Sequence, residues 1–345
     1  MFCPPSTQNT GIWKSAKRDQ KKQEIVLRDK SDDYARIITS SAVSRQENWT
    51  AYYAIYLSKL SFVLPTSYFP KAKLDKIQRK ATSATLTKGG YVATFPRKVT
   101  NGPMMYGGLT MRPLWAEQVV QQVQTMMKHL RCRGDGQSML QINLAWAQLS
   151  TGMGFPIFDR TDINLPHLDD ALFSSIRDGL NMVQGSIKMV DTYVIRHRRM
   201  ADSHLMDGVC SSKQFTPGQI RKINACRLYL QVTLVSDIST TCGRLIEPTF
   251  YHGLKQERPT RPSLRYPRQN KPNSQAWIMW RRALNSLLLR DDKKHWVTPL
   301  GKWNRQDEQS QRWKFYADLE YIYQQKEWTQ SFTRHSLATI NRRFN

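Results

Sequence analysis

The stretch that decides the fold is PKAKLDKIQRKATSATLTKGG, residues 70–90 of the 345-residue chain. Its apolar side chains recur every three or four positions, at Leu74, Ile77, Ala81 and Ala84. This spacing places them on one face of an α-helix. Pro70 suits the first turn of a helix, and Gly89-Gly90 suits its end, because glycine accepts the left-handed conformation that closes a helix. The stretch therefore predicts an amphipathic helix with its own start and stop.

Basic side chains occupy much of the rest of this helix. Lys73, Lys76 and Lys80 recur at helical spacing beside the apolar face. The neighbouring cations are Lys71, Arg79 and Lys88, and Arg97 and Lys98 follow in the next loop. A charged helix face is often only a solvated surface, but it also has the chemistry to follow a row of phosphates. Both interpretations stay open, and the eight cations are the candidate phosphate contacts.

Outward from this helix the pattern remains helical. A helix is expected at about 33–64, and Pro65 ends it. Further helices are expected at 114–130, 139–149, 167–183, 216–238 and 277–288. The segment 91–108 is rich in Gly and Pro and predicts an ordered, irregular loop, while 187–195 fits a short strand. Aromatic clusters at 313–316, 321–323 and 328–332 predict further short strands. The expected fold class is mainly α, with a small C-terminal β hairpin or meander.

Composition divides the chain into four expected regions. Residues 1–30 are charged and poor in aliphatic side chains, which predicts a flexible basic N-terminus. A helical region follows at 31–150, and the Gly- and Pro-containing link at 152–156 separates it from a second helical subdomain at 157–290. Within that subdomain, 244–275 is rich in Arg, Lys and Pro and predicts an exposed basic linker. Residues 295–345 form the β-containing tail.

The whole chain is strongly basic. Its 52 Lys and Arg residues against 27 Asp and Glu give a formal net charge of +25. Such an excess favours polyanionic partners, because each neutralised phosphate releases counterions. The expected partner is nucleic acid rather than a membrane surface, and no apolar run is long enough to cross a bilayer. The five cysteines are scattered without a CxxC pair, so we expect reduced thiols and an intracellular location, in the nucleus or the cytoplasm.

One block carries a family resemblance. Residues 89–118 read GGYVATFPRKVTNGPMMYGGLTMRPLWAEQ. Further blocks with the same resemblance occur in the order that the family has them. They lie at 44–45, 74–78, 128–131, 146–148, 206–207, 226–230, 236–238 and 300–303. Together they resemble the thumb and downstream C-terminal region of non-LTR retroelement reverse transcriptases, over nearly all of the chain after Ser31. The resemblance implies a thumb-like helical bundle at 31–150 whose basic helix lies along a primer–template duplex.

The same resemblance implies that fingers and palm, with the carboxylates that hold two metal ions, belong N-terminal to this chain. Asp32-Asp33 is flanked by charged residues and lacks the apolar strands of a polymerase turn. Ser31, Asp32 and Asp33 are instead expected to open a helix, where acidic groups meet the positive end of the helix dipole. No catalytic residue, metal ligand or cofactor is therefore assigned.

Two further clusters have functional chemistry. His197, Asp202, His204 and Asp207 lie close together in the sequence, but their spacing fits no standard metal site and predicts polar surface residues. Several tryptophans lie among Arg and Lys and have the rings to stack on bases. They are Trp277, Trp280, Trp296, Trp303, Trp313 and Trp328. Their spacing favours core positions for most of them.

The sequence therefore predicts a reverse-transcriptase-derived fragment without fingers and palm. It would bind RNA, DNA or their hybrid through phosphate contacts, with no polymerase activity of its own, and the resemblance adds other retroelement proteins as partners. Three alternatives stay open. The chain is a helical protein-interaction scaffold, a truncated gene model of an active RNA-directed DNA polymerase, or a decayed element without a selected function.

Overall fold

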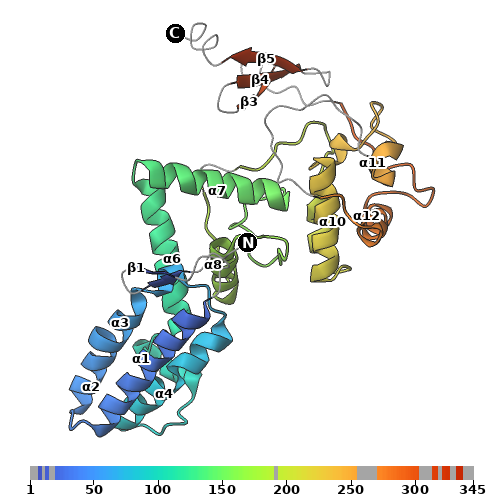
Figure 1. Ribbon diagram of the computed structural model, residues 1–345. Helices are drawn as coiled ribbons and strands as arrows, with labels where there is room; N and C mark the ends of the chain where they lie inside the picture. The colour runs from blue at the N-terminus through green and yellow to red at the C-terminus, as the bar shows by residue number, and fades with distance from the viewer. Residues whose placement is uncertain are drawn as a thin grey trace. The chain divides into compact units, whose positions relative to one another are not determined.

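The computed structural model describes residues 20–189, 193–254 and 270–302, together with the backbone of five short strands. The chain is mainly helical, as expected, and divides into two compact units (Figure 1). Unit 1 comprises Met1–Ile142 and Asp170–Gly185, and unit 2 comprises Asn143–Asp169 and Ser186–Asn345. None of the helices in the described residues has the length and apolarity that a bilayer-spanning segment needs.

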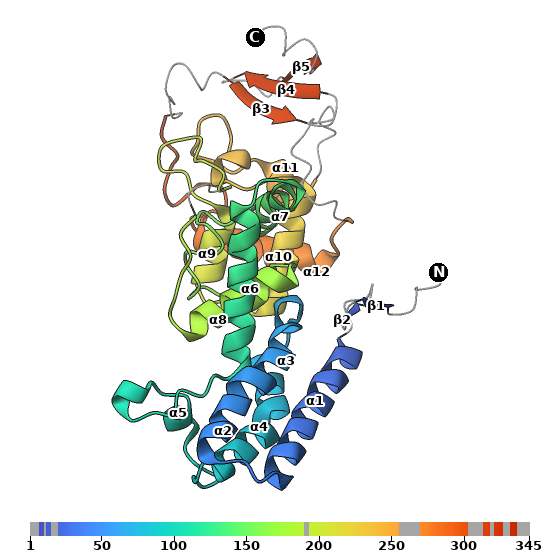
Figure 2. The ribbon, with the colours of Figure 1, turned by 90° about the vertical axis from the view of Figure 1, so that its left-hand side faces the viewer.

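Helices lie side by side in the N-terminal part of unit 1 (Figure 2). They are α1 (Lys21–Ser40), α2 (Arg45–Ala51), the π-helical segment η1 (Tyr52–Leu57), α3 (Ser58–Ser61) and α4 (Lys71–Lys88), with the 3-10 turn η2 (Leu64–Thr66) before α4. Helices α1 and α4 run parallel, since Glu24 pairs with Lys73 near their starts and Tyr34 contacts Thr85 further along. The helix expected after Pro70 is confirmed, with Gly89 at its C-terminal end.

The single helix expected at 33–64 is wrong. Helix α1 already begins at Lys21 and buries Leu27, so residues 21–30 are helical and not a flexible terminus. The chain then breaks at Ser44, whose hydroxyl accepts from Glu47 N while the Glu47 carboxylate accepts from Ser44 N. This capping box starts a new helix, α2. Of the rest of the 1–30 segment, β1 (Thr7–Asn9) pairs antiparallel with β2 (Ile12–Lys14), and the other residues before Gln20 lie outside the described residues.

Tyrosines and aliphatic side chains form the core of unit 1. Its largest members include Leu27, Tyr34, Tyr52, Tyr56, Leu60, Leu74, Ile77, Leu86 and Leu114. Several buried polar groups find partners inside this core, which avoids the desolvation cost of leaving them unpaired. Ser31 Oγ donates to Ile77 O at 2.7 Å, and Gln78 Nε2 donates to Tyr52 Oη at 2.8 Å. These bonds fix α1, α4 and η1 against one another.

The segment after α4 is an ordered loop, as expected, and it contains the short helix α5 (Arg97–Thr100) and the 3-10 turn η3 (Met104–Tyr106). Backbone bonds close it on itself: Leu109 N donates to Val99 O at 3.1 Å and Thr110 N to Gly102 O at 2.9 Å. A Cβ at Gly108 would lie 2.1 Å from Gly102 O, so glycine is required by this close approach.

Two longer helices complete unit 1, α6 (Leu114–Arg131) and α8 (Ala171–Met182). A Cβ at Gly179 of α8 would lie 2.1 Å from Val119 Cγ2 of α6, so the two helices pack closely. The sequence predicts residues 171–182 in the second subdomain, but the structure has them in unit 1, against Val119. Gln122 of α6 also contacts α8, since its Oε1 accepts from Ser175 Oγ at 3.0 Å, while its Nε2 donates to Ser67 O at 2.6 Å.

The boundary between the two units lies within α7 (Asp135–Thr151), and the end of this helix belongs to unit 2. The other elements of unit 2 are α9 (Leu205–Ser211), α10 (Pro217–Leu230), η4 (Val235–Asp237), α11 (Pro248–His252) and α12 (Ser274–Leu287). The fully buried Arg227 of α10 donates to Leu149 O at 3.0 Å and to Ser150 O at 2.6 Å. Since the last carbonyls of a helix lack partners within it, Arg227 caps α7. The boundary expected at 152–156 is therefore shifted upstream into this helix.

Three further expectations for unit 2 are corrected. Helix α10 ends at Leu230 and does not reach Ile238, because Gln231 turns to φ 58°. The start of the expected linker, 244–254, is folded: Ile246 N donates to Lys294 O at 2.9 Å, and α11 buries Phe250. Residues 255–269 lie outside the described residues. The third is the short strand expected at 187–195. No strand forms at 187–189 or 193–195, which are the described residues of that segment.

The C-terminal strands are β3 (Trp313–Ala317), β4 (Tyr321–Lys326) and β5 (Phe332–Ser336). They pair antiparallel in the order β3-β4-β5, which is the expected meander. The third strand is described from Phe332, and its expected start at 328 falls in 327–331, which lie outside the described residues.

Candidate nucleic-acid interface

Helix α4 separates its apolar and basic side chains as the sequence predicts. Leu74, Ile77 and Ala81 are buried in the core of unit 1. Of the six candidate cations on this helix, Lys88 is half-buried and the other five are exposed. The chain thus presents a solvated, positively charged surface on a helix whose opposite face is fixed by packing.

Three of these cations already have carboxylate partners. Lys73 Nζ lies 2.8 Å from Glu24 Oε2, and Lys80 Nζ lies 2.7 Å from Asp32 Oδ2, so both reach across to α1. Lys71 pairs with Asp75 one turn along α4. Exposed pairs of this kind contribute only about 0.2–1 kcal/mol each. They nonetheless lower the net positive charge that these lysines offer to a phosphate.

The other five candidates have no acidic partner within residues 20–189, 193–254 and 270–302. They are Lys76, Arg79, Lys88, Arg97 and Lys98. We call them the free cations. Lys76 and Arg79 lie on α4, while Arg97 and Lys98 form the start of α5.

Figure 2 shows α5 standing away from the helices of the bundle, on the side opposite α1. The structure therefore divides the eight candidates. Lys73 and Lys80 point to α1, and Arg97 and Lys98 lie on the far side of the bundle. The close backbone bonds of the loop hold α5 in a defined place there.

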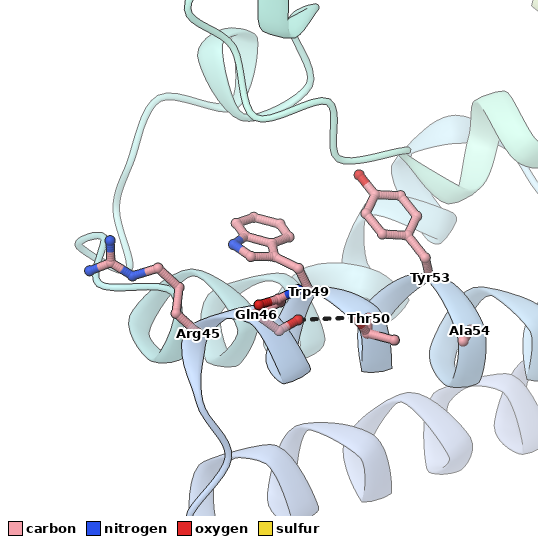
Figure 3. A pocket seen from close by; sticks show the side chains of 6 residues that line it. All are labelled: Arg45, Gln46, Trp49, Thr50, Tyr53 and Ala54. Atoms are coloured by element: carbon pink, nitrogen blue, oxygen red, sulfur yellow. Dashed lines mark hydrogen bonds between the residues drawn. The ribbon is translucent and has the colours of Figure 1, made fainter.

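An open pocket of about 680 Å³ lies on the exposed face of α2 and η1, lined by Arg45, Gln46, Trp49, Thr50, Tyr53 and Ala54. Figure 3 shows Trp49 and Tyr53 standing on the same face of the helix and pointing toward the segment that passes above it, with Arg45 at one end. Arg45, Trp49 and Tyr53 are four residues apart in turn, which is the spacing that aligns side chains along a helix.

Contacts with the segment after α4 position the three side chains. Tyr53 Oη donates to Thr110 O at 2.9 Å, and Trp49 packs over Gly89. The Arg45 guanidinium crosses Gly90, where a Cβ would come within 2.4 Å of Nη2. Partial burial raises the pKa of Tyr53, although the positive charge of Arg112 opposes the shift. The phenol therefore stays neutral and keeps its donor at neutral pH.

Sequence reasoning did not find this pocket. The sequence predicts one helix at 33–64 here, and none of Arg45, Trp49 and Tyr53 is among the candidate site residues. The signal was present in the arrangement Arg-x₃-Trp-x₃-Tyr, in which a cation and two rings share one helix face. The helix boundary at Ser44 had to be known before that face was visible.

Asp32 and Asp33 lie in the middle of α1, so the expectation that they open a helix is wrong. Both are ion-paired, Asp32 with Lys80 and Asp33 with Arg36. Ser31 beside them is buried and bonded to Ile77 O. The pair thus lies within a helix and has local partners.

The histidine cluster is more buried than the sequence indicates. Asp202 and His204 are buried, not polar surface residues, and His197 Nε2 lies 3.2 Å from His204 Nδ1. Asp202 accepts from the backbone of Arg198, Ser203 and Ser236, so it joins its own turn at 198–203 to Ser236. Desolvation lowers the pKa of His204 and raises that of Asp207. No group of three such side chains in the described residues is arranged to hold a metal ion.

The described tryptophans of the C-terminal half follow the core interpretation. Trp277, Trp280 and Trp296 are buried. The side chains of Trp303, Trp313 and Trp328 lie outside the described residues.

Comparison of the chain with protein-family models, with curated protein sequences and with solved structures gave no match.

Proposed function

We propose that this protein binds RNA, DNA or their hybrid through phosphate contacts made by unit 1. The observation that carries the proposal is the set of free cations, which α4 and α5 hold on packed backbone without acidic partners in the described residues. Cations that are not neutralised locally release counterions from a phosphate strand and so provide affinity without reading sequence. The formal net charge of +25 supports the same partner.

The proposed origin of this surface is the thumb and downstream region of a retroelement reverse transcriptase. The ordered glycine-rich loop between two helices supports it, since the residues that carry the resemblance at 89–118 build that loop. We assign no nucleotide-adding activity to the described residues, because Asp32 and Asp33 lie within a helix and pair with cations.

The test is a salt titration of binding to a 20-base-pair duplex. The variant combines Lys76→Ala, Arg79→Ala, Arg97→Ala and Lys98→Ala. Its log Kd against log salt slope is expected to flatten by up to about 3.6, since each of the four lost phosphate contacts contributes about 0.9. The matched control removes four exposed cations of unit 2, with Lys222→Ala, Arg290→Ala, Lys293→Ala and Lys294→Ala. Equal slopes for the two variants would contradict a specific role for unit 1.

A protein-interaction scaffold is the second candidate, and one observation favours it. Met104, Met105 and Tyr106 at the tip of the loop are 74%, 80% and 80% exposed. Adjacent exposed apolar side chains on an ordered loop are typical of protein-binding surfaces. Replacing all three by Ser leaves nucleic-acid affinity unchanged if the tip serves a protein partner, and lowers it if the tip contacts nucleic acid.

A further inference from the structure

The pocket on α2 and η1 combines aromatic rings with a cation, two kinds of group that seldom share a small surface. Its wall holds the indole of Trp49 and the phenol ring of Tyr53, and its end holds the guanidinium of Arg45 (Figure 3). The volume of about 680 Å³ falls within the range of small-ligand pockets, roughly 300–1,000 Å³. An occupant that suits both chemistries has a flat apolar ring and a negative charge nearby.

We propose that this pocket takes an unpaired nucleobase of the bound strand, stacked on Trp49 and Tyr53, with Arg45 on the adjoining phosphate. This inference rests on the proposed function and deepens it, because it assigns unit 1 a preference for single-stranded or frayed ends over blunt duplex. Every base has an aromatic face, so such stacking does not depend on sequence.

Charge complementarity favours a nucleotide over an apolar peptide side chain. Arg45 has no carboxylate partner within residues 20–189, 193–254 and 270–302. The segment after α4, which contacts Arg45 at Gly90 and Tyr53 at Thr110, also carries Arg97 and Lys98. Both are exposed and have no acidic partner in that part of the chain. A strand that follows these cations past the pocket brings its bases within reach of the two rings.

The pocket is held open before any ligand binds, which lowers the cost of ordering it. Tyr53 is fixed by its bond to Thr110 O. Trp49 rests on Gly89, and its neighbour Asn48 anchors α2 through Nδ2 to Thr85 O at 2.9 Å. The π-helical segment η1 begins just after Trp49, and such segments occur frequently at functional sites.

The experiment compares a blunt duplex with the same duplex carrying a single-stranded extension that contains 2-aminopurine. The whole chain is used, with Trp49→Leu as the test variant. Its affinity for the extended duplex is expected to fall about 5- to 150-fold, the effect of losing one base-stacking contact. Its affinity for the blunt duplex stays within about twofold. The wild-type protein quenches 2-aminopurine fluorescence, and the variant does not.

Trp146→Leu is the matched control, because Trp146 is 48% exposed in unit 2 and lies outside the pocket. It leaves affinity and quenching unchanged. Arg45→Gln removes an exposed side chain, so it tests the site even if Trp49→Leu is unstable. It is expected to weaken binding of the extended duplex more than that of the blunt one.

The outcomes separate this inference from the function on which it rests. If Arg45→Gln and Trp49→Leu bind both duplexes as the wild type does, the pocket is not a base site, while phosphate binding by unit 1 stands. An equal loss on both duplexes by Arg45→Gln also overturns the base site, because it makes Arg45 an ordinary phosphate contact. If the wild-type protein binds neither duplex, the proposed function fails and the base site fails with it.

Discussion

The exposed cations of α4 in unit 1 and the most buried arginine of unit 2 have opposite roles. In unit 1, Lys76 and Arg79 extend into solvent from α4 and have no acidic partner in the described residues. In unit 2, Arg227 is fully buried and donates to the carbonyls of Leu149, Ser150 and Val232. A guanidinium surrounded by backbone carbonyls holds the fold together and has no donor left for a phosphate. Net charge alone therefore does not show which cations are available to a ligand.

Arg199 repeats the pattern of Arg227 elsewhere in unit 2. It is 6% exposed, and it donates to Gly301 O at 2.9 Å and to Thr241 O at 3.3 Å. Gly243, at φ 72°, lies against its guanidinium as Gly152, at φ 66°, lies against that of Arg227. In both places a left-handed glycine makes room for a buried arginine, so the local backbone and the cation depend on each other.

The largest expected effect tests this structural use of charge. Arg227→Met takes the donor from Leu149 O and Val232 O, at about 1–3 kcal/mol each, while Ser150 O keeps its bond from Asn224 Nδ2. The free energy of unfolding of unit 2 should fall by roughly 3–5 kcal/mol, measured by urea denaturation. Arg221→Met is the control, because Arg221 is exposed and donates to one carbonyl, Pro166 O. A loss at Arg227 no larger than that at Arg221 would remove the distinction between the two units.

The next effect concerns the loop that presents Arg97 and Lys98. Gly108→Ala places a methyl group 2.1 Å from Gly102 O, so the loop has to open. The expected loss is about 2 kcal/mol of stability, with faster proteolysis between α4 and α6. Binding of the blunt duplex should weaken as well, since two free cations are no longer held in place. Gly218→Ala is the control, because a Cβ there meets nothing within 4 Å. Unchanged proteolysis of Gly108→Ala would show that the loop does not need this close approach.

The α4 face was predictable because local signals agree there: an apolar stripe, a proline before the helix and glycines after it. The failures share a different cause. Residues 21–30 look disordered because Gln23 and Ser31 occupy core positions, and a buried polar side chain bonded within the fold is invisible to hydrophobic periodicity. Whether Arg227 or Lys80 is free to bind a ligand depends on carbonyls and carboxylates distant in sequence, so no local pattern encodes it.

The smallest effect sharpens the contrast within unit 1 itself. Glu24→Gln with Asp32→Asn frees Lys73 and Lys80 on α4. Because both pairs are partly exposed, stability should fall by no more than about 1–2 kcal/mol in total. Duplex affinity should rise, and the salt slope should steepen by up to about 0.9 for each lysine that becomes a phosphate contact.

The matched control for that last change is Asp29→Asn on the same helix. Asp29 is exposed and unpaired within the described residues, so the substitution removes one negative charge without freeing a lysine. A contact effect predicts that Asp32→Asn steepens the salt slope and Asp29→Asn does not, and that adding Lys80→Ala to Asp32→Asn cancels the gain. If the two single variants behave alike, α4 contributes only to the overall positive electrostatic potential of the protein. The phosphates are then bound by α5 and its loop.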